Sequence, residues 1–391
     1  MRIVDVCAFY TPLGGGVKTY VDRKLRAVQS YGHELVVIAP GEADGWTEVA
    51  PGARLRMIAG PAFPLDPRYR YFDDEARLHA ELDSLAPDIV ECATPWGSAG
   101  MVERWPAPVP RALIMHLDVF ATYPYRWLGG IADTRTIDVP FAFFWRRMRR
   151  FGASYDAIVC ANRGLVAQLA DHDVPSVVYE PMGVDPNRFS PDRRDEGLRE
   201  SLLASLHLPP DATLLLGVGR FSPEKRWPMI GQAVTAAGYQ HKVGMVLVGE
   251  GRRRPQIERS FAGNPHLRVL GRTNNRDELA SLMASADALV HGSESESFGM
   301  VGAEARASGL PVIMPDKGGC AEQAANGMGW TYRAGDGHAL AALLNEVIGR
   351  PIAECRARSA AAADKVRTMD EHFADLFARY ESIVEGRRRA A

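Results

Sequence analysis

The chain has 391 residues, 46% of them hydrophobic and 24% charged, which is enough for two packed globular domains. Its formal net charge is −2, so no overall positive field favours a nucleic acid partner. No apolar run approaches the roughly 18 residues of a membrane span, and the run after Arg2 is cut short at Pro12, so we expect neither a spanning helix nor a signal peptide.

The five cysteines are scattered along the chain, and three of them, Cys7, Cys92 and Cys160, lie inside predicted strands. Buried free thiols are the simplest interpretation of such positions. No cysteine or histidine pattern has the spacing of metal ligands. We therefore expect a cytoplasmic protein without a metal site.

Short apolar runs alternate with helical patterns along the whole chain, which predicts an α/β fold with parallel sheets. The strands expected in the first half are 3–9, 34–39, 88–93, 112–116, 157–161 and 177–179. Those expected in the second half are 213–218, 243–248, 267–270, 288–291, 312–314 and 330–332. Turn residues gather at 181–191, so we expect two Rossmann-like domains, residues 1–182 and 183–369, followed by a last helix.

Three glycines, Gly14, Gly15 and Gly16, follow the first predicted strand and precede a helix. Glycines at such a turn allow a ligand to approach the backbone closely. The dinucleotide-binding fingerprint is not met, because Thr19 stands where its third glycine should be and the second strand does not end in an acidic residue. The pattern disfavours a dehydrogenase and leaves a ligand-binding loop or a simple tight turn.

His116 ends the predicted strand 112–116, and Asp118 follows two residues later. A histidine at the end of a strand is more often held by a structural hydrogen bond than used in a site. From these residues alone, both interpretations remain open.

The segment 141–151 predicts an amphipathic helix with an unusual composition. One stripe carries the apolar side chains Phe141, Phe144, Trp145, Met148 and Phe151, and off it lie the arginines Arg146, Arg147, Arg149 and Arg150. Such a helix could lie at a membrane interface with its arginines on anionic headgroups. Packing of the stripe into the core, with a solvated basic face, is the favoured interpretation. The two can coexist, because the arginines alone could contact lipid.

In the second half, Arg220 and Lys225 bracket the turn that follows the predicted strand 213–218. This is the carboxyl end of a strand, where open α/β sheets bind ligands. The planar fork of arginine and the compact charge of lysine both suit a diphosphate. A solvated turn is the alternative, and the strand context makes it the weaker one.

The segment 296–319 combines two carboxylates with a predicted helix start. Glu296 follows the strand 288–291, the helix begins near Gly299, and Glu304 lies about one turn inside it. A helix N-terminus attracts phosphate, whereas carboxylates accept hydrogen bonds from sugar hydroxyls. The arrangement therefore suits a nucleotide sugar, and a surface helix with glutamate in its first turn is the alternative.

This segment resembles the Glu-x7-Glu motif of retaining GT-B glycosyltransferases of family 4. The resemblance rests on Glu296 and Glu304, on the residues 297–299 and 309–312, and on Gly318-Gly319, and it extends over nearly the full chain. It implies a GT-B fold, in which two Rossmann-like domains face each other across a cleft. It also implies that residues 370–391 form a helix that crosses back to the N-terminal domain.

The resemblance implies a role for individual residues. In the family the first glutamate contacts the donor sugar and the second the nucleotide ribose, while an arginine and a lysine hold the leaving phosphates. The implied catalytic residues are His116, Arg220, Lys225 and Glu296, with His116 and Asp118 on the acceptor side. The implied donor-binding residues are Gly15, Gly16, Gly219, Arg220, Lys225, Arg272, Thr273, Glu296, Ser297, Phe298, Gly299, Met300, Val301 and Glu304.

The implied activity is retaining transfer of a hexose from a UDP-glucose-like donor or GDP-mannose to a hydroxyl of a lipid or saccharide. No cofactor or metal is implied, because cations of the chain replace the metal at the diphosphate. Peripheral contact with an anionic membrane at its inner face is the further expectation for helix 141–151. One alternative is an epimerase or phosphorylase of similar fold. The other is a non-catalytic subunit that binds a sugar nucleotide. Such a subunit would be expected to lack Arg220, Lys225 or Glu296, and all three are present.

Overall fold

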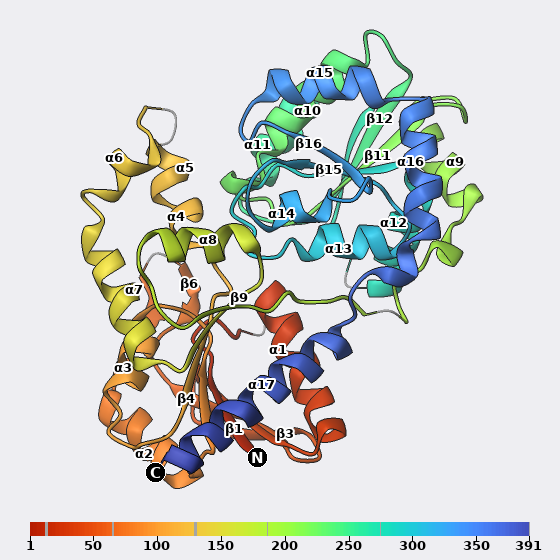
Figure 1. Ribbon diagram of the computed structural model, residues 1–391. Coiled ribbons are helices and arrows are strands. Elements are labelled where there is room, and N and C mark those ends of the chain that lie inside the picture. Colours follow the sequence, from red (N-terminus) through yellow and green to blue (C-terminus); the bar gives the residue numbers. More distant parts are fainter. Residues whose placement is uncertain (12–14, 65, 129–130, 186, 274, 391) are drawn as a thin grey trace. The chain divides into compact units, whose positions relative to one another are not determined.

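The computed structural model describes residues 1–391 except 12–14, 65, 129–130, 186, 274 and 391 (Figure 1). The chain divides into two compact units. The N-terminal unit comprises Met1–Asp118, Leu128–Pro181 and Asp370–Ala391, and the C-terminal unit comprises Val119–Trp127 and Met182–Met369. The expected N-terminal domain, 1–182, is thus interrupted at Val119–Trp127, a segment whose Arg126 lies 4.0 Å from Glu224 of the C-terminal unit.

The N-terminal unit is built on an eight-stranded sheet in the order β10-β9-β8-β7-β1-β2-β4-β3. Its neighbouring strands are parallel except for the antiparallel pair β3 and β4. The strands are β1 Arg2–Val6, β2 Glu34–Gly41, β3 Gly45–Ala50, β4 Ala53–Ala59, β7 Ile89–Cys92, β8 Arg111–Ile114, β9 Ala157–Cys160 and β10 Val177–Tyr179. A separate two-stranded ribbon joins β5, Ala62–Phe63, to β6, Asp66–Arg70.

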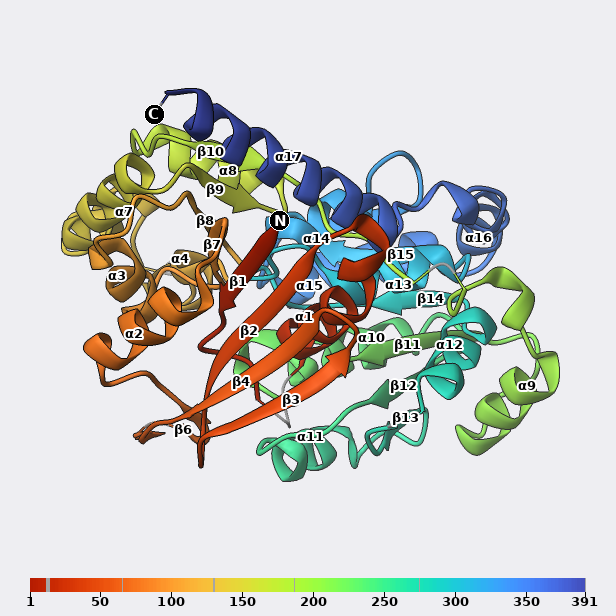
Figure 2. The same ribbon diagram turned by 90° about the horizontal axis from the view of Figure 1, so that it is seen from below.

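Helices follow most of these strands. They are α1 Gly16–Ala27, α2 Glu75–Leu85, α3 Gly97–Arg104, α6 Thr134–Asp138, α7 Ala142–Ser154, α8 Arg163–Asp171 and α17 Met369–Ala390. The short helices α4 Val119–Thr122 and α5 Pro124–Leu128 coincide with the segment that belongs to the C-terminal unit, apart from Leu128. The side chains of Asp74 and Asn162 start α2 and α8 by accepting hydrogen bonds from backbone N–H groups of the first turn. From Asp370 on, α17 belongs to the N-terminal unit and lies beside α1 and β1 in Figures 1 and 2.

A buried charged cluster lies in the centre of the N-terminal unit. Asp5 on β1 and Glu91 on β7 are paired in register, and Lys24 of α1 forms ion pairs with both. None of the three side chains is exposed. Tyr380 of α17 donates a hydrogen bond to Glu91 Oε2 over 2.6 Å, which ties the last helix to the same cluster.

The C-terminal unit contains a six-stranded parallel sheet in the order β13-β12-β11-β14-β15-β16. Its strands are β11 Thr213–Val218, β12 Val243–Val248, β13 Leu267–Leu270, β14 Ala288–Val290, β15 Val312–Pro315 and β16 Gly329–Tyr332. The helices are α9 Glu196–Ser205, α10 Trp227–Ala237, α11 Arg254–Phe261, α12 Arg276–Ser285, α13 Met300–Ala307, α14 Gly318–Gln323, α15 Gly337–Val347 and α16 Arg350–Ala361. Short 3₁₀ turns are η2 Pro191–Arg193, η3 Pro223–Lys225 and η4 Ala363–Lys365 in this unit and η1 Val28–Tyr31 in the N-terminal unit.

Every strand expected from the sequence is present, and the α/β class with two Rossmann-like units is confirmed. Details of the prediction were wrong at strand ends and at the sheet edge. The strand expected at 3–9 ends at Val6, and the one expected at 112–116 ends at Ile114, so His116 lies beyond it. The strands β3 to β6 were missed, because β3 is largely exposed and β4 alternates Arg54 and Arg56 with apolar residues instead of forming a continuous apolar run.

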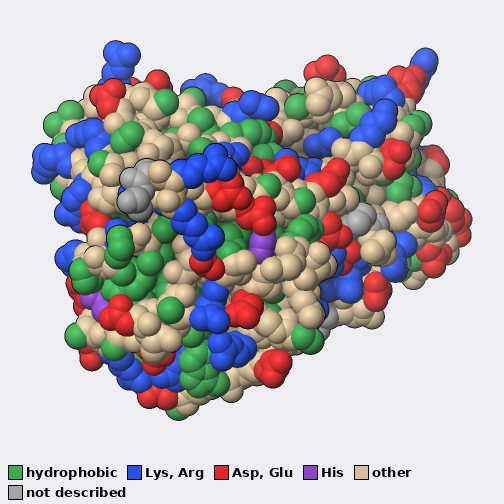
Figure 3. Space-filling view, turned by 60° about the horizontal axis from the view of Figure 1, so that its bottom comes forward, with side chains coloured by type: hydrophobic (Ala, Val, Ile, Leu, Met, Phe, Trp, Pro, Cys, Tyr) green, Lys and Arg blue, Asp and Glu red, His purple; other side chains and the backbone are tan. Residues whose placement is uncertain are grey.

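The aromatic stripe of α7 lies in the core of the N-terminal unit. Phe144, Trp145, Met148 and Phe151 are all less than 9% exposed, whereas Phe141, the fifth residue of the expected stripe, precedes α7 and is partly exposed. The four buried side chains are not available to a membrane, while contact of the arginines with lipid remains a prediction. Among the described residues, no helix is both long and apolar enough to cross a membrane. Figure 3 shows Lys and Arg side chains interspersed with Asp and Glu over the face that it draws, in keeping with the small net charge.

Candidate functional site

The strand order of the C-terminal unit reverses between β11 and β14. Counted within this unit, the order is 3-2-1-4-5-6, and β11 and β14 are its first and fourth strands. In open parallel sheets of this kind, ligands bind outside the carboxyl ends of the two strands at which the order reverses. Here those ends lead into the segments 219–226 and 291–299, which contain most of the residues predicted for the donor.

The segment after β11, which carries Arg220 and Lys225, is held by hydrogen bonds to its backbone. Phe221 N donates to Glu250 O over 2.8 Å, and Trp227 Nε1 donates to Arg220 O over 3.1 Å. Gly219 adopts a φ of 153°, where a Cβ atom would lie 3.3 Å from the Trp227 ring. The Arg220 side chain is exposed, and within the described residues it has no ion-pair partner.

Lys225, Glu296 and His291 form one contiguous group. Lys225 Nζ forms an ion pair with Glu296 Oε1, and His291 Nε2 lies 3.5 Å from the same oxygen. Burial, together with the Lys225 charge, lowers the pKa of His291. Burial by itself would raise the pKa of Glu296, but Lys225 and His291 hold it well below its usual range. Near neutral pH Glu296 is therefore a carboxylate and His291 a neutral imidazole.

His291 was missed as a functional candidate, although the signal was present as a polar residue closing the apolar run 288–291. A second ion pair, between Arg226 and Glu294, joins the same two segments. Arg226 Nη2 donates to Glu294 Oε1 over 2.7 Å. Lys225 thus pairs with Glu296 and Arg226 with Glu294, and these two ion pairs hold the segments 219–226 and 291–299 together.

The segment 296–299 packs closely against the glycine pair that follows β15. A Cβ atom on Gly319 would lie 2.6 Å from the backbone of Phe298, and Gly319 N donates to Glu296 O over 2.8 Å. Gly299 precedes α13 with a φ of 82°, and no side chain caps this helix. The N–H groups of its first turn, where Met300 and Val301 lie, are therefore open to an anionic ligand.

Glu304 lies on α13 and is only 4% exposed. Burial raises its pKa, while Arg276, whose Nη2 is 2.5 Å from Glu304 Oε1, lowers it. Arg276 begins α12 directly after the segment that holds Arg272 and Thr273, so this segment and Glu304 are neighbours. Arg272 is exposed, and the Thr273 hydroxyl donates to Glu278 Oε2 over 2.5 Å. Arg276 could not be identified from the sequence, because its partner is 28 residues away along the chain.

The remaining predicted residues belong to the N-terminal unit. Gly15 precedes α1 and Gly16 begins it, and a Cβ atom at either position would meet nothing within 4 Å, so space alone does not require glycine there. Gly14 lies outside the described residues. His116 is packed against Tyr20 with ring centroids 4.9 Å apart, and burial lowers its pKa to about 4 although Glu91 opposes this. Asp118 is partly exposed. Burial raises the pKa of the Cys160 thiol, and the negative charge of Asp118 raises it further.

The structure thus groups the predicted residues into two sets, one in each unit. In the C-terminal unit it joins Lys225 to Glu296 and Glu304 to Arg276, which places each glutamate of the motif beside its own cation. In the part of the chain that the structure describes, no group of His, Cys, Asp and Glu side chains is arranged to hold a metal ion. The five cysteines are buried and free.

Sequence comparison identifies two family descriptions that together cover most of the chain. The one described as "Glycosyl transferases group 1" matches residues 199–366, and the one described as "Glycosyltransferase Family 4" matches residues 14–188. A "GDP-mannose-dependent alpha-mannosyltransferase" of Mycolicibacterium smegmatis is 30% identical over 325 residues, which is 82% of this chain and 80% of that protein. A "GDP-mannose-dependent alpha-(1-6)-phosphatidylinositol dimannoside mannosyltransferase" of Mycobacterium tuberculosis is 29% identical over 340 residues, 82% of this chain and 84% of that protein.

Solved structures share the fold at lower sequence identity. Sucrose-phosphate synthase from Thermosynechococcus elongatus superposes with a TM-score of 0.79 at 17% identity, covering 99% of this chain and 100% of that one. Anabaena Alr3699/HepE in complex with UDP superposes with a TM-score of 0.72 at 16% identity, covering 98% of this chain and 100% of that one. At these identities the likeness concerns the fold alone.

Proposed function

The chain belongs to the group 1, family 4 glycosyltransferases, which have the GT-B fold, and on this basis we propose that it transfers mannose from GDP-mannose, with retention of configuration, to a hydroxyl of a lipid or saccharide. The observation that carries the proposal is the Lys225–Glu296 pair between β11 and β14, beside the uncapped start of α13. The donor is inferred from the two relatives named above, both of which are named as GDP-mannose-dependent.

The donor diphosphate would lie between Arg220, Lys225 and the first turn of α13. Arg220 is exposed and has no ion-pair partner among the described residues, so it is available to a phosphate oxygen. Lys225 can share its three donors between Glu296 and the diphosphate. These groups would stabilise the charge that develops on the leaving diphosphate as the sugar–phosphate bond breaks, which is the function of a preorganised electrostatic site. No metal is needed for that step.

The two glutamates would contact different parts of the donor. Glu296 remains a carboxylate at neutral pH, because Lys225 and His291 lower its pKa, and it would accept hydrogen bonds from sugar hydroxyls. Glu304, beside Arg276, would accept from the ribose hydroxyls of the nucleotide. Neither glutamate is assigned as a nucleophile: the acceptor hydroxyl would attack the face that the diphosphate leaves, and its proton would pass to the departing phosphate oxygen.

His116 would contribute from the N-terminal unit as a neutral group. Its pKa of about 4 means that the imidazole is uncharged at neutral pH, so it can donate or accept a hydrogen bond at the transferred sugar or the acceptor. Asp118 would contact acceptor hydroxyls.

The donor assignment is tested by incubating the purified protein with GDP-mannose, UDP-glucose and related donors and measuring released nucleotide. We expect GDP release from GDP-mannose to exceed release from every UDP-sugar, and to rise when a phosphatidylinositol-based or mannoside acceptor is added. Product NMR should show an α-linked mannose, as retention requires. Preferential UDP release would refute the donor, and turnover that no acceptor stimulates would favour an epimerase.

The different roles of Glu304 and Glu296 are tested by calorimetry with free GDP and with GDP-mannose. Glu304→Gln should weaken binding of both ligands by roughly tenfold, because it replaces one of the two carboxyl oxygens that can accept hydrogen bonds at a buried position. Glu296→Gln should leave GDP affinity nearly unchanged, because this side chain would contact only the sugar, and should weaken GDP-mannose and slow turnover. The reverse pattern would show that the two residues are assigned to the wrong parts of the donor.

A further inference from the structure

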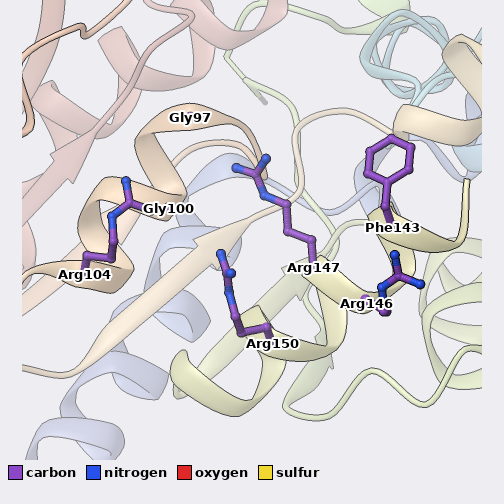
Figure 4. A pocket seen from close by; sticks show the side chains of 7 residues that line it. All are labelled: Gly97, Gly100, Arg104, Phe143, Arg146, Arg147 and Arg150. Carbon is purple, nitrogen blue, oxygen red and sulfur yellow. The ribbon is translucent and has the colours of Figure 1, made fainter.

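A cavity of 540 Å³ lies between α3 and α7 in the N-terminal unit, and none of the residues that line it is among those assigned to the donor. Its volume falls within the roughly 300–1,000 Å³ that is usual for small-molecule sites. Figure 4 shows Arg104 rising from α3, and Arg146, Arg147, Arg150 and Phe143 from α7. Gly97 and Gly100 of α3 leave the space between the helices open.

The four arginines of this cavity are not equally compensated. Arg104 forms an ion pair with Glu75, and Arg150 forms one with Glu103. Arg146 and Arg147, by contrast, have no carboxylate partner within the described residues. The cavity therefore carries two uncompensated positive charges.

Arg147 is the most constrained of the four. Its Nη2 donates to Trp96 O over 2.6 Å, while its buried Nε has no hydrogen-bond partner among the described residues. Burial and the nearby Arg150 both lower its pKa. A half-buried guanidinium whose Nε has no acceptor is unfavourable, and an anion in the cavity would supply the missing acceptor and the missing charge.

The guanidinium groups of Arg104 and Arg147 converge over Gly100. A Cβ atom on Gly100 would lie 3.3 Å from Arg104 Nη1 and 3.7 Å from Arg147 Nη2. Like charges that converge in this way repel each other unless a shared anion lies between them. The glycine leaves room for such an anion to approach the α3 backbone.

We propose that this cavity binds a phosphate group, as a monoester dianion carried by a soluble sugar phosphate or by the headgroup of an anionic lipid. A phosphate monoester carries a charge of about −1.5 to −2 at neutral pH, which matches the two uncompensated arginines better than one carboxylate does. Arginine forks suit phosphate oxygens in geometry as well as charge. Phe143, whose side chain is 59% exposed at the same cavity, would contact the apolar part of the ligand.

The binding test uses calorimetry with glucose 6-phosphate, with glucose as the uncharged control and with no nucleotide present. We expect Arg146→Gln and Arg147→Gln each to weaken glucose 6-phosphate binding by roughly tenfold or more. Arg149→Gln is the matched control, because Arg149 lies on the same helix but donates to His172 O over 3.1 Å, away from the cavity. Arg146 is exposed, so its variant should fold normally even if the Arg147 variant does not.

A second measurement distinguishes the two sources of phosphate. The same variants are sedimented with phosphatidylcholine vesicles that contain or lack phosphatidic acid. Binding of glucose 6-phosphate that depends on Arg146 and Arg147 identifies a soluble ligand, and vesicle binding with the same dependence identifies a lipid headgroup. The proposal is overturned if neither ligand depends on these two arginines, or if Arg149→Gln weakens binding equally. Both measurements are independent of transfer activity, so failure of the proposed donor would not affect them.

Discussion

Replacing Lys225 or Arg220 by alanine is expected to reduce turnover by roughly 100- to 1,000-fold, the effect of removing one preorganised donor from a developing negative charge. The reason differs between the two residues. Arg220 is exposed and would meet the diphosphate only in the donor complex, whereas Lys225 already pairs with Glu296. Steady-state rates at saturating donor and circular dichroism of the folded variants are the measurements.

A surface lysine of the same unit provides the control for this experiment. Lys242 pairs with Asp211 at the surface, where both side chains are more than 60% exposed. Lys242→Ala should leave turnover unchanged, since exposed ion pairs contribute only about 0–1 kcal/mol. Near-normal turnover in both the Arg220 and Lys225 variants would contradict the assignment of the diphosphate to this site.

Lys24→Met should lower the free energy of unfolding of the N-terminal unit by about 3–5 kcal/mol, because it leaves two buried carboxyl groups without their cation. Asp5 and Glu91 are neighbours on adjacent strands and are fully buried. Burial and Glu91 already raise the pKa of Asp5 to about 7, against the opposing effect of Lys24. Denaturant unfolding followed by fluorescence measures the loss.

The pH dependence of this variant gives a second readout. Without Lys24, both carboxyl groups should have higher pKa values in the folded than in the unfolded state, so folding is favoured when they are protonated. The stability of the variant should therefore be greatest at low pH and should fall as the pH rises through those folded pKa values. Lys18→Met is the control on the same helix, because it removes only a partly exposed ion pair with Asp22. It should lower the free energy of unfolding by less than about 1 kcal/mol. Equal losses in the two variants would show that the buried cluster is not held by Lys24.

The strands could be predicted where both faces of the sheet are covered. The run 213–218 is apolar at almost every position because β11 lies in the centre of a parallel sheet with no exposed face. The same reasoning failed at β3, which is an edge strand whose exposed side chains include Glu48. In an edge strand, half of the backbone groups form hydrogen bonds with water and the exposed side chains are solvated. Its sequence therefore lacks the continuous apolar run that identifies a central strand.

The candidate site was predictable only in its local parts. The spacing from Glu296 to Glu304 and the turn from Arg220 to Lys225 are short-range patterns, and their roles stay predictions that the experiments above address. The pairing of Lys225 with Glu296 joins residues 71 positions apart, and no pattern in the sequence specifies it. The order of β11 and β14 in the sheet brings these residues together, and the same contact brings His291 into the group.

By itself the sequence determined that the chain is an α/β protein of two Rossmann-like units, because the apolar runs and the turns between them are local properties. It also determined that segment 141–151 forms an amphipathic helix, since a helical stripe is set by the residue spacing. Only the tertiary structure decided what covers that stripe. It also decided that Arg149 donates to His172 O, whereas the other three arginines of the helix line a cavity with Arg104. Spacing along a chain fixes the direction of a side chain relative to its own helix, whereas its neighbours depend on how distant segments pack.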